Sequence, residues 1–227
     1  MNSSVVIFPG SNCDRDMSVA LKKFGFKNKM VWHDDADLPK SDLVVLPGGF
    51  SYGDYLRCGS MASKSKIIKS VIKFANSGGL LMGICNGFQI LTETQLLPGV
   101  LLRNKLSKFI CKNVYVKINN TKNKYFKKIK KNTIELHIAH NEGNYYCSND
   151  QMNLIEDNNQ IAMSYCNKNG EINEKYNPNG SSKNIAGILN KEKNVLGMMP
   201  HPERMIDKYL SGDDGAIFFE NLFNNLK

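Results

Sequence analysis

A cysteine between two glycines is the residue whose position most clearly suggests chemistry. Cys85 lies in the run Gly-Ile-Cys-Asn-Gly, residues 83–87, directly after the apolar residues 80–82. A strand that ends in Gly-x-Cys-x-Gly and turns at once into a helix is typical of a nucleophile elbow, whose sharp turn exposes the nucleophile. The amides at the start of that helix favour thiolate over thiol. Since free cysteines are often buried and structural, the motif alone leaves that alternative open.

A cysteine nucleophile needs a base for its thiol and a group that orients the base. Among the four histidines, His201 follows an apolar run and stands between two prolines, with Glu203 two residues later. Prolines restrict φ on either side, and side chains two residues apart in an extended segment share one side. Glu203 can therefore hold the imidazole in one tautomer. His33 fits a surface residue, His137 fits a structural residue within a strand, and His140 fits either role.

The first part of the chain predicts the sheet that positions these groups. Its segments alternate as β-α-β-β-α-β-α, and the apolar strands are continuous. This pattern is typical of a mostly parallel central sheet with helices on both faces, where ligands bind beyond the carboxyl ends of the strands. Gly48 and Gly49 follow one such strand, as Cys85 follows another, so we expect them to share one edge. Two adjacent glycines let backbone N–H groups approach a ligand, although an ordinary turn has the same pattern.

Periodicity and turn residues predict the remaining elements. Residues 119–131 are polar and basic, which predicts a solvated loop or hairpin tip, and residues 140–146 predict a turn. The strands before and after that loop alternate in polarity, which fits a small antiparallel section. Without a repeat or a long linker, residues 1–227 are expected to form a single domain. We expect strands at residues 5–8, 29–32, 42–46, 80–84, 109–118, 133–139, 161–165, 185–189 and 195–199, and helices at 13–24, 60–76, 86–94 and 213–226.

Composition and charge narrow the classes of function. The net charge of +9 suggests an acidic partner or substrate, and much of it lies within residues 103–131. Few aromatic residues interleave with those charges, so nucleic-acid binding is not expected. The six cysteines form no CxxC pair, which argues against a zinc site or a disulfide framework, and we expect no metal and a reducing, cytoplasmic location. No apolar run is long enough for a membrane span or a signal peptide.

Taken together, these motifs resemble the class I (triad) glutamine amidotransferases over nearly the whole chain. The resemblance rests on residues 8–14, 46–59, 83–91, 140–146 and 197–204. The runs Phe-Ser-Tyr-Gly-Asp-Tyr and His-Asn-Glu-Gly-Asn-Tyr-Tyr are similar to those of one branch, the glutaminase subunits of phosphoribosylformylglycinamidine synthases. The resemblance implies a flavodoxin-like fold.

The resemblance also implies a role for each matching residue. Cys85 is implied as the nucleophile, His201 as the general base and acid, and Glu203 as the carboxylate that orients the imidazole. The backbone N–H groups of Gly49 and Asn86 are implied as the oxyanion hole. The implied contacts with glutamine are Gln89, Asn141, Glu142, Gly143, Asn144 and Tyr145.

The activity implied is hydrolysis of L-glutamine to glutamate and ammonia through a glutamyl thioester. The ammonia is implied to pass to a synthetase subunit, which uses ATP and Mg²⁺ to convert formylglycinamide ribonucleotide into its amidine in purine biosynthesis. A small third subunit is also implied. The Gly48-Gly49 turn lacks the Lys-Ser/Thr of a phosphate-binding loop, so no cofactor is expected in this chain.

The same motifs are also compatible with other functions. The chain can be a glutaminase subunit of another amidotransferase, or a catalytically silent binding subunit. It can also be a cysteine hydrolase of the DJ-1/PfpI type, although those sites usually draw their histidine from beside the cysteine, where this sequence has Asn86.

Overall fold

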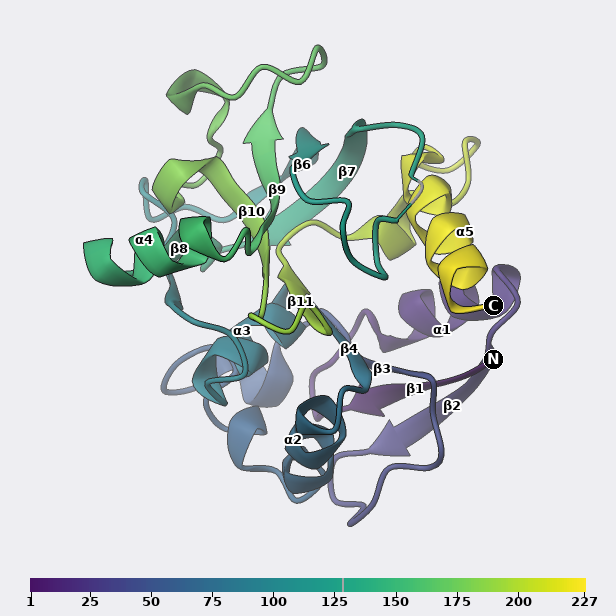
Figure 1. The fold of residues 1–227 in the computed structure, drawn as a ribbon. Coiled ribbons are helices and arrows are strands. Elements are labelled where there is room, and N and C mark those ends of the chain that lie inside the picture. Colours follow the sequence, from purple (N-terminus) through teal and green to yellow (C-terminus); the bar gives the residue numbers. More distant parts are fainter. Residues whose placement is uncertain (128) are drawn as a thin grey trace.

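A nine-stranded sheet forms the centre of the computed structural model, which describes residues 1–127 and 129–227. The strand order is β2-β1-β3-β4-β11-β10-β9-β6-β7 (Figure 1). The strands from β2 to β11 pair in parallel, and the neighbours from β11 to β7 pair antiparallel. The predicted parallel sheet is therefore confirmed, and β5 with β8 forms a further small antiparallel sheet.

The described elements have the following bounds. The strands are β1 (Asn2–Ile7), β2 (Lys27–Trp32), β3 (Leu43–Leu46), β4 (Leu80–Ile84), β5 (Val100–Leu102), β6 (Ile110–Ile118), β7 (Thr133–His140), β8 (Asn144–Tyr146), β9 (Ile161–Cys166), β10 (Ile185–Leu189) and β11 (Val195–Met198). The α-helices are α1 (Asp14–Lys23), α2 (Ile68–Asn76), α3 (Asn86–Glu93), α4 (Asn149–Asp157) and α5 (Asp214–Leu226). Within the described ranges, no helix has both the length and the apolar composition needed to cross a membrane.

The parallel strands read as continuous apolar runs because helices cover both faces of the sheet. Every residue of β3 and β4 is buried. In the strand order, the connection from β1 to β2 moves toward one edge of the sheet, and the connection from β3 to β4 moves toward the other edge. Because such connections are right-handed, α1 and α2 lie on opposite faces of the sheet. Helix α5 contacts the residue that follows α1, since the rings of Phe24 and Phe219 stack with their centroids 5.7 Å apart.

The helix predicted at residues 60–76 is wrong in its first half, since α2 begins only at Ile68. A short 3₁₀ turn, Ala62–Lys64, precedes it, and Ser65 is extended. The Ser63 hydroxyl donates to the Ser60 carbonyl at 2.7 Å, and the Ser65 hydroxyl lies 3.0 Å from that of Tyr52. Serine side chains that bond to nearby groups in this way compete with helical hydrogen bonds.

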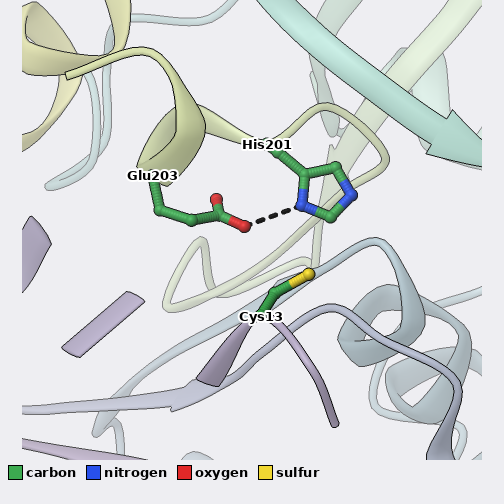
Figure 2. Close-up of side chains that lie close together, drawn as sticks. All are labelled: Cys13, His201 and Glu203. Atoms are coloured by element: carbon green, nitrogen blue, oxygen red, sulfur yellow. Dashed lines mark hydrogen bonds and ion pairs between the residues drawn. The ribbon is translucent and has the colours of Figure 1, made fainter. Parts of the chain in front are cut away.

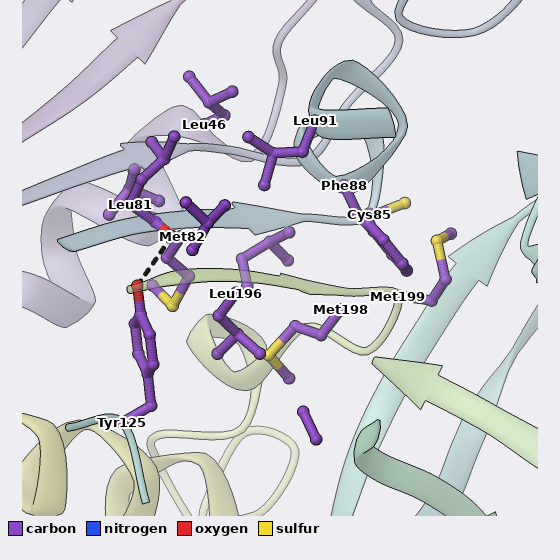
Figure 3. Packing of buried hydrophobic residues seen from close by; sticks show 14 of the residues in the cluster. Leu46, Leu81, Met82, Cys85, Phe88, Leu91, Tyr125, Leu196, Met198 and Met199 are labelled. Carbon is purple, nitrogen blue, oxygen red and sulfur yellow. Dashed lines mark hydrogen bonds between the residues drawn. The ribbon is translucent and has the colours of Figure 1, made fainter. Parts of the chain in front are cut away.

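The prediction of a solvated loop at residues 119–131 is also wrong in part. Residue 128 lies outside the described residues, but Tyr125 and Phe126 are fully buried. The Tyr125 hydroxyl lies 2.8 Å from the carbonyl oxygen of Leu81 in β4 (Figure 3). It also lies 2.7 Å from the carbonyl oxygen of Asn194, just before β11. The basic residues of this stretch therefore lie on a loop that two aromatic side chains fix to the core.

Helix α4 and the β5–β8 sheet have no counterpart among the predicted elements. Helix α4 places only Met152 and Ile155 in the interior, so its apolar periodicity is weak. Ser148 caps it by accepting from the Gln151 amide at 3.3 Å. Strand β8 falls within the predicted turn at residues 140–146, where tertiary pairing with β5 decides the conformation.

Candidate active site

Cys85 stands on a strained turn between β4 and α3. Its backbone angles are φ 50° and ψ −104°, in a region that residues with a side chain rarely adopt, and it is the residue that caps α3. A Cβ on Gly87 would lie 2.0 Å from the Leu46 carbonyl oxygen, and one on Gly83 would lie 2.6 Å from that of Gly87. The turn geometry predicted for a nucleophile elbow is therefore present, and both glycines are required by close backbone contacts.

Gly49 and Asn86 lie at the same edge of the sheet as Cys85, as the parallel topology predicted. β3 and β4 pair with Leu46 opposite Gly83, so the loops after the two strands are neighbours. Gly49 has φ 138°, and a Cβ there would approach the Asn12 amide to 2.6 Å. Asn86 is the first residue of α3, where the helix leaves its backbone N–H groups free for a ligand. Their role as an oxyanion hole stays a prediction.

His201 and Glu203 lie at that edge because β11 pairs with β4. Met198 is opposite Ile84, and the Cys85 amide donates to the Met198 carbonyl at 2.7 Å. The Nδ1 atom of His201 lies 2.7 Å from Oε1 of Glu203, and both side chains are buried. A carboxylate at Nδ1 fixes the tautomer and leaves Nε2 free to exchange a proton with another group. The expected orientation of the histidine by the glutamate is thus observed, and its catalytic role stays a prediction.

The environment of His201 favours its protonated form. Burial acts to lower the pKa of the imidazole, but the carboxylate of Glu203 and the thiol groups of Cys85 and Cys13 act in the other direction and raise that pKa well above 6.5. An imidazolium next to Cys85 stabilises a thiolate, which is the nucleophilic form of the side chain.

Replacing Glu203 with glutamine is expected to lower the rate of glutamate release by roughly 10²–10⁴-fold, because the imidazole loses the carboxylate that fixes its tautomer. The same change removes the main group that raises the pKa of His201, so that pKa falls and the fraction of imidazolium decreases at neutral pH. The measurement is the pH profile of glutamate release for Glu203→Gln, with the exposed Glu220→Gln in α5 as the control. Equal profiles for the two variants would contradict this role of Glu203.

The residues predicted to contact glutamine form a chain of hydrogen bonds beside Cys85. The Nδ2 atom of Asn86 donates to Oε1 of Gln89 at 2.9 Å, and Nε2 of Gln89 donates to the carbonyl of Glu142 at 2.7 Å. The Gly143 amide donates to Oδ1 of Asn104 at 3.1 Å. The start of α3 is therefore tied directly to the segment between β7 and β8.

The other predicted contacts differ in their surroundings. Asn141 is exposed, and Asn144 is partly buried near Arg103. Tyr145 is fully buried, where its ring stacks on Phe88 and its hydroxyl donates to the Pro98 carbonyl at 2.9 Å. The side chain of Tyr145 thus packs in the core, while its neighbours remain open to a ligand, and the substrate contacts of all these residues stay predictions.

Sequence reasoning assigned no role to Asp54 and Cys58, which lie beside this chain of hydrogen bonds. Oδ1 of Asp54 accepts from Nδ2 of Asn86 at 3.4 Å. Burial and the neighbouring carboxylates of Glu142 and Asp54 raise the pKa of the Cys58 thiol. Burial also raises the pKa of Asp54, and Glu142 adds to this increase although the hydrogen bond from Cys58 opposes it. Both residues belong to the run at 46–59, so the resemblance was the signal that could have identified them.

Sequence reasoning also missed Cys13 and Arg204, which lie next to the histidine and glutamate. Nη2 of Arg204 donates to the Cys13 sulfur at 3.1 Å. Sγ of Cys13, a ring nitrogen of His201 and a carboxylate oxygen of Glu203 all lie within 4.8 Å of one another (Figure 2). The site therefore holds a second thiol in addition to Cys85.

A small cavity reaches this group of side chains. It has a volume of about 200 Å³, and Cys13, Gly49, Ala139 and His201 contribute to its walls. A larger cavity of about 860 Å³ includes Leu96 in its lining but none of the predicted site residues. We take the small cavity as the relevant one, because its walls include one predicted oxyanion donor and the predicted base.

His140 is a buried neutral histidine in this structure. Its Nδ1 lies 3.0 Å from Oδ1 of Asn104, whose amide nitrogen donates to two carbonyl groups, so Nδ1 carries the proton. Burial, and secondarily the charge of His201, lowers the pKa of His140 to about 4. His140 is therefore disfavoured as the catalytic base, since Asn104 rather than a carboxylate holds its Nδ1.

We expect His140 to make the protein less stable in acid. Between pH 6.5 and pH 4 the unfolded chain binds a proton at this residue and the folded chain does not, so the free energy of unfolding falls by up to ~3 kcal/mol over that interval. Denaturant unfolding of the unaltered chain and of His140→Gln at several pH values measures this contribution. The difference in free energy between them should shrink as the pH falls, and a difference independent of pH would contradict the assignment.

Comparisons with known proteins agree with the geometry. Residues 1–212 match the family of the CobB/CobQ-like glutamine amidotransferase domain. The chain is 76% identical over 227 residues to the phosphoribosylformylglycinamidine synthase subunit PurQ of Pelagibacter ubique, covering 100% of both chains. It is 49% identical to the subunit of the same name of Zymomonas mobilis, covering 98% of each. It also superimposes on a chain in the structure of PurLQS from Thermotoga maritima, with a TM-score of 0.87, 41% identity and coverage of 100% of this chain and 99% of that one.

Proposed function

This chain belongs to the CobB/CobQ-like glutamine amidotransferase family, and we propose that it is the glutaminase subunit of a phosphoribosylformylglycinamidine synthase. In this proposal residues 1–227 act as one domain, which hydrolyses glutamine and supplies the ammonia to a synthetase. The observation that carries the proposal is Cys85 on a strained elbow at the same sheet edge as a buried, hydrogen-bonded His201–Glu203 pair. The full-length similarity to PurQ subunits selects the branch of the family.

The first half of the reaction forms a thioester. The Cys85 thiolate attacks the side-chain carbonyl carbon of glutamine, and the carbonyl oxygen becomes an oxyanion. The N–H groups of Gly49 and Asn86 receive that oxyanion, and a donor of this kind contributes roughly 3 kcal/mol to stabilising the transition state. The His201 imidazolium then gives its proton to the departing nitrogen, so that ammonia leaves and a glutamyl thioester remains.

The second half of the reaction releases glutamate. His201 is now neutral and accepts a proton from water, whose oxygen attacks the thioester carbonyl. Collapse of the second oxyanion breaks the bond to sulfur, and glutamate leaves with Cys85 again as the thiolate. Throughout both steps Glu203 keeps the imidazole oriented, since its Oε1 holds Nδ1 at 2.7 Å.

The charged end of glutamine is proposed to bind between α3 and the segment that follows β7. The carboxylate of Glu142 lies close enough to Asp54 to contribute, after burial, to the raised pKa of Asp54, and this acidic end of the site is proposed to receive the substrate ammonium group. Gln89 joins the two segments through its bonds to Asn86 and to the Glu142 carbonyl. Asn141 and Asn144, which come from the segment around Glu142, are proposed to receive the remaining polar atoms of the amino-acid group.

The synthetase reaction requires other chains. We propose that a PurL-type synthetase subunit holds ATP and Mg²⁺ and converts formylglycinamide ribonucleotide to its amidine, and that a small PurS-type subunit completes the assembly. The structure of PurLQS contains a chain with this fold, which supports that arrangement. The described cysteines are free, and a thiolate nucleophile requires a reducing environment, so we propose a cytoplasmic location.

The test is glutamate release by this chain, alone and with the cognate synthetase and third subunit, together with formation of the amidine. The proposal predicts that glutamine supports amidine formation only when this chain is present, whereas added ammonium salt supports it without the chain. Glutamate release without any amidine formation would favour the alternative, a glutaminase that serves another synthetase. Absence of glutamate release in every combination would contradict the glutaminase itself.

A further inference from the structure

Cys13 is a buried thiol at the catalytic edge that the proposed hydrolysis does not use. It lies between β1 and α1, far in sequence from the other residues of the site, and is 2% exposed. Its sulfur lies within 4.8 Å of donor atoms from both His201 and Glu203, which are 1% and 2% exposed (Figure 2). Gly48 leaves the space between thiol and imidazole open, since a Cβ there would lie 3.3 Å from the sulfur and 2.6 Å from Cε1 of His201.

Two further atoms of this group are buried and lack a hydrogen-bond partner among the described residues. They are Nε2 of His201 and Oε2 of Glu203. A buried polar atom without a partner is costly, and in native structures it commonly marks a catalytic group, an ordered water or an ion. Nε2 of His201 is the atom that exchanges a proton in the proposed hydrolysis, so the spare coordination capacity of this cluster lies at Oε2 of Glu203, close to the Cys13 sulfur and to the histidine ring.

These donors match the preferences of zinc. Zn²⁺ binds cysteine sulfur at about 2.3 Å, histidine nitrogen at about 2.0 Å and carboxylate oxygen at about 2.1 Å, in a tetrahedron whose donors lie roughly 3.3–3.6 Å apart. In the structure the three donors lie within 4.8 Å of one another, and Nδ1 of His201 is 2.7 Å from Oε1 of Glu203, so metal binding requires the side chains to shift. The cavity of about 200 Å³ that includes Cys13 and His201 in its lining gives an entry path and room for a water as fourth ligand.

The charges around the cluster are compatible with a divalent cation. A Cys13 thiolate and the Glu203 carboxylate together balance the charge of Zn²⁺. Arg204 donates to the Cys13 sulfur at 3.1 Å and opposes a cation, but its own charge is partly balanced by Asp16, whose Oδ2 lies 3.6 Å from Nε of Arg204.

We propose that Cys13, His201 and Glu203 form an inhibitory site for a thiophilic divalent cation such as Zn²⁺. On binding, the metal takes Sγ of Cys13, Nδ1 of His201 and a carboxylate oxygen of Glu203. The thiol proton and the proton at Nδ1 go to solvent. The imidazole is then held by the metal and is no longer oriented by the free carboxylate, so hydrolysis of glutamine stops. The binding site stands on the geometry alone, and the inhibition rests on the proposed function.

Binding is tested with Co²⁺ as an optical probe, because a thiolate bound to Co²⁺ gives a strong near-ultraviolet charge-transfer band. The reduced full-length chain carrying Cys85→Ala should still show this band, since Cys85 is not one of the proposed metal ligands. Adding Cys13→Ser or Cys13→Ala to that chain should abolish the band. The matched control is Cys111→Ser, because Cys111 lines the same cavity and its sulfur lies 3.5 Å from Nε2 of His137.

The outcomes separate the alternatives. A band that survives both Cys13 substitutions, or that is lost in Cys111→Ser, would overturn the site, as would the absence of any band. Inhibition is tested in the complete complex as the ratio of glutamate release with and without added Zn²⁺. We expect the Zn²⁺ concentration for half-inhibition to rise at least tenfold in Cys13→Ser relative to the unaltered chain. A Cys13-dependent Co²⁺ band without inhibition by Zn²⁺ would contradict the proposed inhibition but would leave the metal site in place.

Discussion

Replacing Cys85 with alanine is expected to abolish glutamine-dependent formation of the amidine by the complete complex, with a loss on the order of 10⁴-fold or more, because the proposed thioester forms on this sulfur. Ammonium salt should still support the synthetase reaction, since that step does not use the thiol. The measurement compares amidine formation with glutamine and with ammonium salt as nitrogen source. Glutamine-dependent activity in Cys85→Ala that is reduced by much less than 10⁴-fold would show that another residue is the nucleophile.

The control for this variant is Cys166→Ala. Cys166 is a free cysteine at the end of β9 and lies outside the lining of the small cavity, so its removal deletes a thiol of the same chain without altering the elbow. It should retain both activities. Loss of the ammonium-dependent reaction in Cys85→Ala would instead indicate that the variant no longer assembles with the synthetase. In that case the loss of glutamine-dependent activity would not identify Cys85 as the nucleophile.

Replacing Gly87 with alanine is expected to destabilise the protein strongly. In a helix, alanine is favoured over glycine by about 1 kcal/mol, so propensity alone predicts a gain in stability. The structure opposes this, because the added Cβ would lie 2.0 Å from the Leu46 carbonyl oxygen, a backbone atom of β3 that cannot move without disturbing the sheet. Overpacking of this kind typically costs 1–3 kcal/mol or more, so we expect a net loss of roughly 2 kcal/mol or greater in the free energy of unfolding.

Denaturant unfolding of Gly87→Ala measures this loss, and Gly78→Ala is the comparison. At Gly78 a Cβ meets no atom within 4 Å, but φ is +85°, so that variant shows the cost of backbone strain without overlap. We expect Gly87→Ala to be the less stable of the two and to release glutamate more slowly, since α3 can no longer approach β3. A Gly87→Ala chain as stable as the unaltered one would show that the elbow tolerates a wider turn.

The elements around the elbow were predictable because their signals are local. The continuous apolar strands β3 and β4 and the glycines around Cys85 all act within a few residues, and parallel topology then brings the strand ends to one edge. The contact predicted between His201 and Glu203 is present at 2.7 Å, but the predicted extended conformation is wrong, since Pro202–Arg204 forms a 3₁₀ helix. The assignment to the family came from the combination of motifs rather than from any one of them.

What the sequence did not reveal depends on contacts between distant segments. Tyr125 appears in a polar, basic stretch, and only its hydrogen-bonding distance to the carbonyls at one end of β4 and β11 explains why it is buried. Cys13 lies 188 positions before His201 in the sequence, so its approach to the imidazole follows from the pairing of strands and not from spacing. Strand β8 forms because β5 offers it a partner, and its own residues read as a turn.

The measurement we would make first identifies the thiol that reacts with the substrate. The complete complex is treated with a glutamine analogue that carries a diazoketone in place of the side-chain amide. Attack by the nucleophilic sulfur forms a carbon–sulfur bond and releases dinitrogen, which leaves a stable adduct for peptide mass spectrometry. We expect one adduct, on Cys85, that excess glutamine prevents and that Glu203→Gln slows. An adduct on Cys13 or on another cysteine with Cys85 unmodified would contradict it, because the proposed triad would then be built around the wrong sulfur.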